Sequence, residues 1–232
     1  MRALFLSLIL MVAALPASAT SLSLNLQPVS LCTDDFVNDS CGKVTIDKDY
    51  LNEIYGQIDI QVTVLDSFAL LGFPLVSDSN GDINPNLALA TFGLFLEPKI
   101  EPNTVYVAFL GDLTGDTVGL AYLDADDFPF AIVQDTYSDQ IGTQITAHEV
   151  GHVLGGEHED ADLSTQLMFP QLNVSIAGQP GYVPGISDAN AATMRSSALL
   201  APVQTIPVPP ALPLLATGGV ALFALRRRRR SA

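Results

Sequence analysis

The feature that most limits how this chain can fold is a short segment that holds three histidines, a glutamate and two adjacent glycines. His148 and His152 are four residues apart, so an α-helix places both imidazoles on one face, with Glu149 beside the first of them. His158 cannot reach the same point from a continuing helix. We therefore expect the helix to end just before Gly155, because glycine adopts positive φ without steric cost.

These residues have the chemistry of a catalytic zinc site. The sequence contains three histidines, and all three lie in this segment. Three neutral imidazoles leave the fourth position of a tetrahedral zinc ion open, whereas structural sites are closed. Bound zinc lowers the pKa of water from about 15.7 to about 7, and an adjacent carboxylate can accept its proton. The segment predicts zinc ligands His148, His152 and His158, with Glu149 as general base in metal-assisted hydrolysis.

The wider pattern resembles the metzincin clan of zinc endopeptidases. The spacing H-E-x-x-H-x-x-G-x-x-H is followed by Met168, which is similar to the methionine in the clan's turn beneath the metal. Residues 148–155 and 167–170 are similar to matrixins, residues 119–123 to reprolysin-like enzymes, and Glu159 to astacins. No tyrosine stands two places after Met168, which puts in doubt the extra tyrosine ligand of astacins and serralysins.

The resemblance implies a zinc endopeptidase that hydrolyses peptide bonds with zinc-activated water. The terminal segments described below add the expectation that it is secreted or surface-sorted. The resemblance also implies a cleft with zinc at its floor, between an upper sheet subdomain and a lower, less regular one. Residues 131–135 would be the edge strand with which an extended peptide substrate pairs, although an ordinary interior strand fits the same residues. Phe169 and Pro170 would form part of the wall of the pocket beyond the cleaved bond.

Hydrophobic periodicity predicts helices and strands on both sides of the histidine segment. Asn84 and Pro85 are typical of a helix start, and so are Ser138 or Asp139 and Ser187. The expected helices are 47–57, 84–95, 138–154 and 187–200, and the expected strands are 58–64, 105–110, 119–123 and 130–134. They predict one catalytic domain, residues 20–205, of the α+β (mixed α/β) class with a small twisted mixed sheet.

The N-terminal residues have the pattern of an export signal. Residues 1–19 combine Arg2, an apolar run and the small residues Ala17-Ser18-Ala19. The apolar run is shorter than the roughly 20 residues that cross a membrane. This pattern predicts a signal peptide that is cleaved before Thr20.

The C-terminal segment 206–232 consists of a proline-rich box, a short apolar run and five consecutive arginines. This order resembles C-terminal sorting signals of the PEP-CTERM type, nearest the variant with a Val-Pro-Leu-Pro-Ala box. The resemblance implies a Gram-negative bacterium in which an exosortase-like enzyme passes the protein to the cell surface. Because basic residues stay on the cytoplasmic side, the body of the protein would face outward. A plain membrane anchor is the alternative.

The expected mature body is strongly acidic. Without Arg2 and the five terminal arginines, four basic residues remain against 25 acidic ones, a net charge of −21. This charge argues against nucleic acid as a partner, because phosphate binding needs a basic surface.

The two cysteines, Cys32 and Cys41, lie nine residues apart in a polar stretch. An exported chain meets an oxidising compartment, which favours a disulfide between them. A cysteine that blocks the zinc in a latent form is the alternative.

Residues 78–84 alternate oxygen-bearing side chains around Gly81, as in half of a calcium-binding loop. They lack a bidentate glutamate at the far end, so a solvated turn is favoured over a Ca²⁺ site. The same question stays open for Asp112, Asp116, Asp124, Asp126 and Asp127.

Two other functions fit parts of the sequence. A non-enzymatic surface or matrix protein could use zinc to stabilise its domain, but Glu149 argues against it because a structural site needs no base. Hydrolysis of a non-peptide amide would use the same residues as hydrolysis of a peptide. Competition by extended peptides distinguishes these two reactions.

Overall fold

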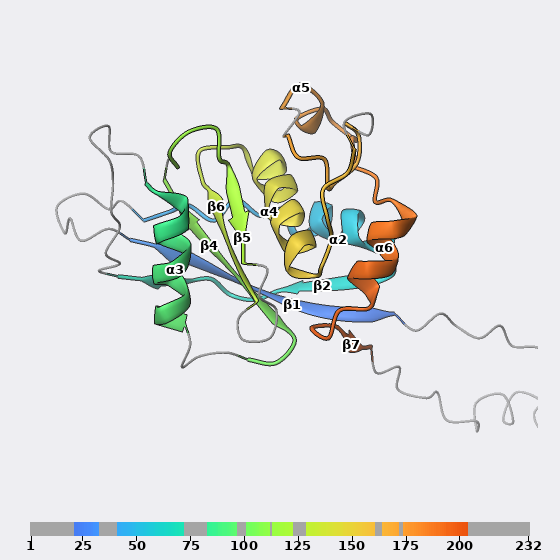
Figure 1. Cartoon of the computed structure of the whole chain (residues 1–232), viewed down its shortest axis with the longest axis horizontal. Helices are drawn as coiled ribbons and strands as arrows, with labels where there is room; N and C mark the ends of the chain where they lie inside the picture. The colour runs from blue at the N-terminus through green and yellow to red at the C-terminus, as the bar shows by residue number, and fades with distance from the viewer. Residues whose placement is uncertain are drawn as a thin grey trace, which may run out of the picture. The chain divides into compact units, whose positions relative to one another are not determined.

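A mixed β-sheet forms the centre of the molecule (Figure 1). The computed structural model describes residues 21–32, 41–71, 83–96, 101–111, 113–122, 129–160, 164–171 and 174–203. Along its main path the sheet has the strand order β2-β1-β4-β6-β5. The strands are β1 (Leu22–Leu31), β2 (Ile60–Val64), β3 (Phe68–Leu70), β4 (Thr104–Leu110), β5 (Gly119–Ala121), β6 (Phe130–Gln134) and β7 (Ala201–Pro202).

Most pairs in this sheet are parallel, and its two faces are covered by different helices. All seven residues of β4 are buried, because Val105, Val107 and Phe109 face one hydrophobic cluster while alternate residues face another. The first cluster includes residues of α2 (Lys48–Gly56) and α4 (Asp139–Val153), and the second includes residues of α3 (Pro85–Leu96). Figure 1 shows α3 and α4 on opposite sides of the strands.

The mixed α/β class expected from the sequence is confirmed, and most elements form within a few residues of their predicted bounds. Helix α2 begins after Asp47, whose carboxylate accepts hydrogen bonds from the backbone N–H groups of Asp49 and Tyr50. The central strand β1 was not predicted. It pairs with β2, β3, β4 and β7. Cys32, one of the two cysteines, directly follows its last residue, Leu31.

Two predictions are corrected by the sheet and by the C-terminal helix. Strand β6 lies between β4 and β5, so it is an interior strand, and β5 forms the edge. Helix α6 (Asp188–Arg195) ends before the expected residue 200. The chain must turn after this helix because β7 returns to pair antiparallel with the start of β1. A further short helix, α5 (Val174–Ala177), lies between α4 and α6 in the chain.

Several predictions fall on residues outside the described ranges. They concern the signal peptide 1–19, the sorting segment 206–232, most of the calcium-loop candidate 78–84, and the residues Asp112, Asp124, Asp126 and Asp127. Asp116 is described and exposed. Within the described part of the chain, no helix has the length and apolar character needed to cross a membrane.

Candidate metal centre

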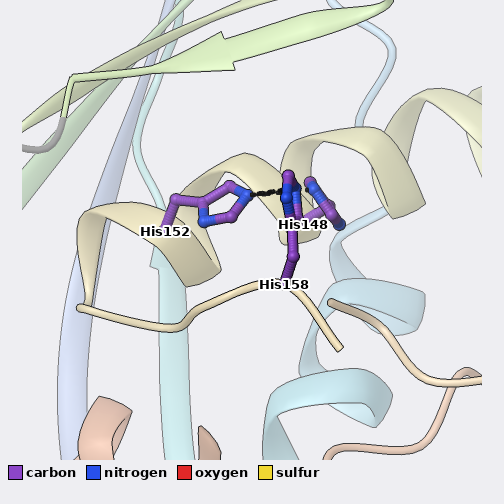
Figure 2. Close-up of side chains that lie close together, drawn as sticks. All are labelled: His148, His152 and His158. Carbon is purple, nitrogen blue, oxygen red and sulfur yellow. Dashed lines mark hydrogen bonds between the residues drawn. The ribbon is translucent and has the colours of Figure 1, made fainter. Parts of the chain in front are cut away.

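Helix α4 and the loop that follows it bring the three histidines together (Figure 2). His148 and His152 are separated by one turn of the helix, which ends at Val153 with Leu154 as its C-cap. Gly155 has φ of 93°, a conformation that side-chain-bearing residues rarely adopt, and it turns the chain back toward the helix. His158 then approaches the two helical imidazoles, as the spacing of the segment predicted.

The three imidazoles point ring nitrogens at one another. The His152 Nε2 atom lies 3.1 Å from His148 Nε2 and 3.0 Å from His158 Nε2. His148 Nδ1 lies 2.7 Å from the Leu167 carbonyl oxygen, and His152 Nδ1 lies 2.8 Å from that of Gly156. A carbonyl oxygen only accepts hydrogen bonds, so each Nδ1 carries the proton and each Nε2 of the helical pair presents a lone pair.

Converging lone pairs repel one another unless a cation lies between them, so this arrangement fits a metal ion. Burial lowers the pKa of His148 to about 4 and also lowers the pKa of His152, which keeps both rings in the neutral form that binds metals. The candidate ligand atoms of the three residues all lie within 4.8 Å of one another. The backbone carbonyls at the two Nδ1 atoms orient the rings, as outer partners do around protein-bound zinc.

Glu149 lies on the same helix, and its side chain lies beside Gly119 of the edge strand β5. Its side chain is only 5 % exposed, and burial raises its pKa to about 8. A divalent cation held by the imidazoles would lower this pKa again, because a nearby positive charge favours the carboxylate. A Cβ added to Gly119 would lie 2.6 Å from the Glu149 Oε1 atom. The bare backbone of the edge strand therefore leaves the space that this carboxyl group occupies.

Met168 packs against the ligand helix; that it forms the turn beneath a bound metal stays a prediction. Its sulfur would lie 2.6 Å from a Cβ added to Gly151, which is adjacent to His152. The Met168 carbonyl oxygen also accepts a hydrogen bond of 2.8 Å from the backbone N–H of Glu159. Met168 is 1 % exposed and so belongs to the core. Its contacts support both the helix and the loop that carry the ligands.

Helix α2 also supports the ligand helix. Tyr55 is fully buried, and its hydroxyl donates a 2.8 Å hydrogen bond to the carbonyl oxygen of Ala147, the residue before His148. Burial raises the pKa of the Tyr55 hydroxyl, with a smaller contribution from the nearby Glu149 carboxylate, so this donor keeps its proton.

The histidines open onto a cleft of about 550 Å³. Edge strand β5 and the three residues before it line this cleft, together with α4, Tyr182 and part of the segment 164–171. Phe169 and Pro170 are among the lining residues, which agrees with their expected place in a pocket wall. Glu149 also lines the cleft, so the carboxyl group and the imidazoles share one open space.

Cys32 and Cys41 form a disulfide at the end of β1. Neither residue lines the cleft, so the structure gives no support to a cysteine that blocks the metal.

Sequence reasoning missed three residues that contact the ligand segment. Tyr55 was covered only by the expected helix 47–57, and Gly119 only by the segment 119–123, which was expected to form a strand. Asn190 of α6 hydrogen-bonds to the backbone of Glu157 and was not noted at all. Asn190 lies 33 positions from Glu157, so their contact leaves no local pattern in the sequence. A short polar side chain in a C-terminal helix is also typical of a solvated face.

Comparisons with solved structures find similar folds at low sequence identity. A zinc-dependent peptidase from Methanocorpusculum labreanum (strain Z) is 14 % identical, with 74 % of this chain and 99 % of that chain covered and a TM-score of 0.48. An archaemetzincin from Methanopyrus kandleri is 13 % identical, with 75 % and 94 % covered and a TM-score of 0.49. No protein-family model matches the sequence, and no curated protein matches it. Residue roles in this chain therefore rest on its own geometry.

Proposed function

We propose that this chain is an exported zinc-dependent endopeptidase. The observation that carries the proposal is the convergence of His148, His152 and His158 beside the buried Glu149 carboxyl group, on one side of an open cleft. A purely structural zinc site has no use for a carboxyl group that is held near the metal without serving as a ligand.

The three imidazoles would hold the zinc ion. When bound, zinc activates a water molecule and polarises the carbonyl group of the scissile peptide bond. The His148 and His152 rings are already neutral and already oriented by backbone carbonyls, so binding requires little rearrangement of either side chain.

The edge strand β5 is the element that would bind an extended substrate. In the antiparallel pair with β6, Tyr122 N–H donates to the Phe130 carbonyl, and Val118 carbonyl accepts from Gln134 N–H. Backbone groups alternate in direction along such a strand, so those of Gly119 and Ala121 point away from β6, toward the open edge. A peptide that pairs with them adds a strand to the sheet next to Gly119, the residue of β5 that lies against Glu149.

Glu149 would move the proton. Its carboxylate accepts a proton from the attacking water and then delivers it to the leaving amine, so that one residue serves both halves of the reaction. Burial between α4 and β5 suits this role, because it limits hydrogen bonding of the carboxylate to bulk water and holds the side chain in one place.

Replacement Glu149→Gln tests this assignment. Glutamine keeps the size of the side chain but accepts no proton, so turnover should fall by roughly 10²- to 10⁴-fold while zinc stays bound. Turnover on a diverse peptide library and zinc content should be measured on the same preparation, with a chelator control. Unchanged turnover removes Glu149 from the mechanism, and loss of zinc makes it a ligand. A wild-type protein that holds zinc but cleaves no peptide favours the non-enzymatic alternative.

Export to the cell surface is part of the same proposal. It is supported by the two terminal patterns in the sequence and by the Cys32–Cys41 disulfide, which suits an oxidising compartment. We expect an exosortase-like enzyme to process segment 206–232. Fractionation of the source cells should find the processed protein at the surface or in the medium. An uncut protein found only in the inner membrane would favour a plain anchor.

A further inference from the structure

The third histidine lies outside the helix, and its loop needs support of its own. His158 and the preceding Glu157 are exposed, so packing of their side chains does not fix the loop. Besides the backbone hydrogen bond from Glu159 to Met168, the loop is attached to the C-terminal helix α6, which contributes no residue to the cleft lining.

Asn190 makes this attachment. Its Oδ1 atom accepts a 2.9 Å hydrogen bond from the Glu157 N–H, and its Nδ2 atom donates a 3.0 Å hydrogen bond to the Glu157 carbonyl oxygen. The same Nδ2 atom donates a 2.6 Å hydrogen bond to the Glu159 Oε1 atom. One side chain therefore holds the residues on both sides of His158.

The surrounding contacts hold Asn190 itself in place. Asn190 is 8 % exposed, and its backbone N–H donates to the hydroxyl of Ser187, the N-cap of α6. That hydroxyl in turn donates to the Glu159 carboxylate. On the next turn of α6, Met194 is fully buried, and its Cε atom would lie 2.6 Å from a Cβ added to Gly156. Helix α6 thus supports the loop at both of its ends.

We propose that Asn190 is a positioning residue that fixes the His158 imidazole for metal binding, and that the metal site is complete only when α6 is docked. The proposal rests on the proposed zinc site. A free loop would lose conformational entropy each time its histidine bound the metal. Asn190 fixes the loop during folding, and outer partners of this kind typically change metal affinity by roughly 10- to 100-fold.

The test measures the zinc dissociation constant of the full chain by chelator competition, together with the absorption spectrum of the Co²⁺-loaded protein. Asn190→Ala should weaken zinc binding by roughly 10- to 100-fold and alter the cobalt spectrum. Ser196→Ala, on the exposed end of the same helix, removes a hydroxyl that does not contact the loop, and it should match the wild type.

A rescue experiment separates positioning from a general effect on folding. Asn190→Asp keeps the size of the side chain but places a carboxylate beside that of Glu159, so zinc binding should weaken. Adding Glu159→Gln supplies an amide donor to the new carboxylate and removes the repulsion, so zinc binding should recover in part, while the hydrogen bond to the Glu157 carbonyl oxygen stays lost. This pair also gives an answer if Asn190→Ala does not fold.

Wild-type zinc affinity and an unchanged cobalt spectrum in Asn190→Ala would overturn the proposal. Zinc binding that does not improve at all when Glu159→Gln is added to Asn190→Asp would overturn it as well. A wild-type chain that binds no zinc overturns both this inference and the proposed function. If Asn190→Ala weakens zinc binding as expected but the wild-type chain cleaves no peptide, the proposed function alone is overturned.

Discussion

Replacement of Gly119 by alanine tests whether the edge strand positions the proposed general base. The added Cβ would lie 2.6 Å from Glu149 Oε1, 2.8 Å from its Cγ and 2.9 Å from its Cδ. Gly119 does not have the positive φ that would strain an alanine, so the backbone tolerates the change. The clash falls on one side chain, and the Glu149 carboxyl group must move.

The size of the effect follows from these distances. Ordinary contacts are about 3.5 Å, and the added Cβ would lie 2.6 Å from Glu149 Oε1. The carboxyl group must therefore move away by about 0.9 Å. A misplacement of about 1 Å can cost about 100-fold in rate, which corresponds to about 2.7 kcal/mol of transition-state stabilisation. We therefore expect Gly119→Ala to lower kcat about 100-fold while the protein still binds zinc.

The assay compares kcat, KM and zinc content of Gly119→Ala with those of Gly56→Ala. The control makes the same chemical change at a position where the added Cβ meets nothing within 4 Å, so its activity should match the wild type. Thermal unfolding of both variants verifies that the domain remains folded.

A double-mutant cycle with Glu149→Gln identifies the cause of any loss. If Gly119 acts through Glu149, the alanine should cost little once the base has been removed. An equal further loss in the Glu149→Gln background would refute this reasoning. A raised KM with an unchanged kcat would also refute it, because the alanine would then obstruct the substrate strand and leave the base in place.

Two other predictions concern the third ligand, His158, and the hydrogen bond by which Tyr55 supports the ligand helix. His158→Ala should weaken zinc binding by more than the roughly 10- to 100-fold expected for an outer partner. The zinc content of the protein after dialysis measures this loss, and full retention of zinc would remove His158 from the ligand set. Tyr55→Phe should lower the free energy of unfolding by about 1 kcal/mol, because the buried Ala147 carbonyl loses its 2.8 Å partner. Urea unfolding of the metal-free protein measures this loss, and an unchanged midpoint would show that the hydrogen bond contributes nothing.

Local sequence patterns were enough to predict the parts of the site that lie on one helix and its turn. The four-residue spacing of His148 and His152 predicts one helical face, and the glycine predicts the turn that brings back His158. The same holds for the helix expected over 47–57, which forms as α2, and for the strand expected over 105–110, which forms as β4. Each of these features depends on neighbours within a few positions, so periodicity and capping chemistry contain the information.

Tertiary structure alone decided which strand forms the edge and which side chains support the ligands. Residues 130–134 and 119–121 are both short strands, and nothing local in either of them specifies that β5 lies outside β6. The contact between Gly119 and Glu149 spans 30 positions, and that between Asn190 and Glu157 spans 33. Strand order and helix docking result from the burial of two hydrophobic clusters across the whole sheet, and many sequences satisfy that requirement with different partners.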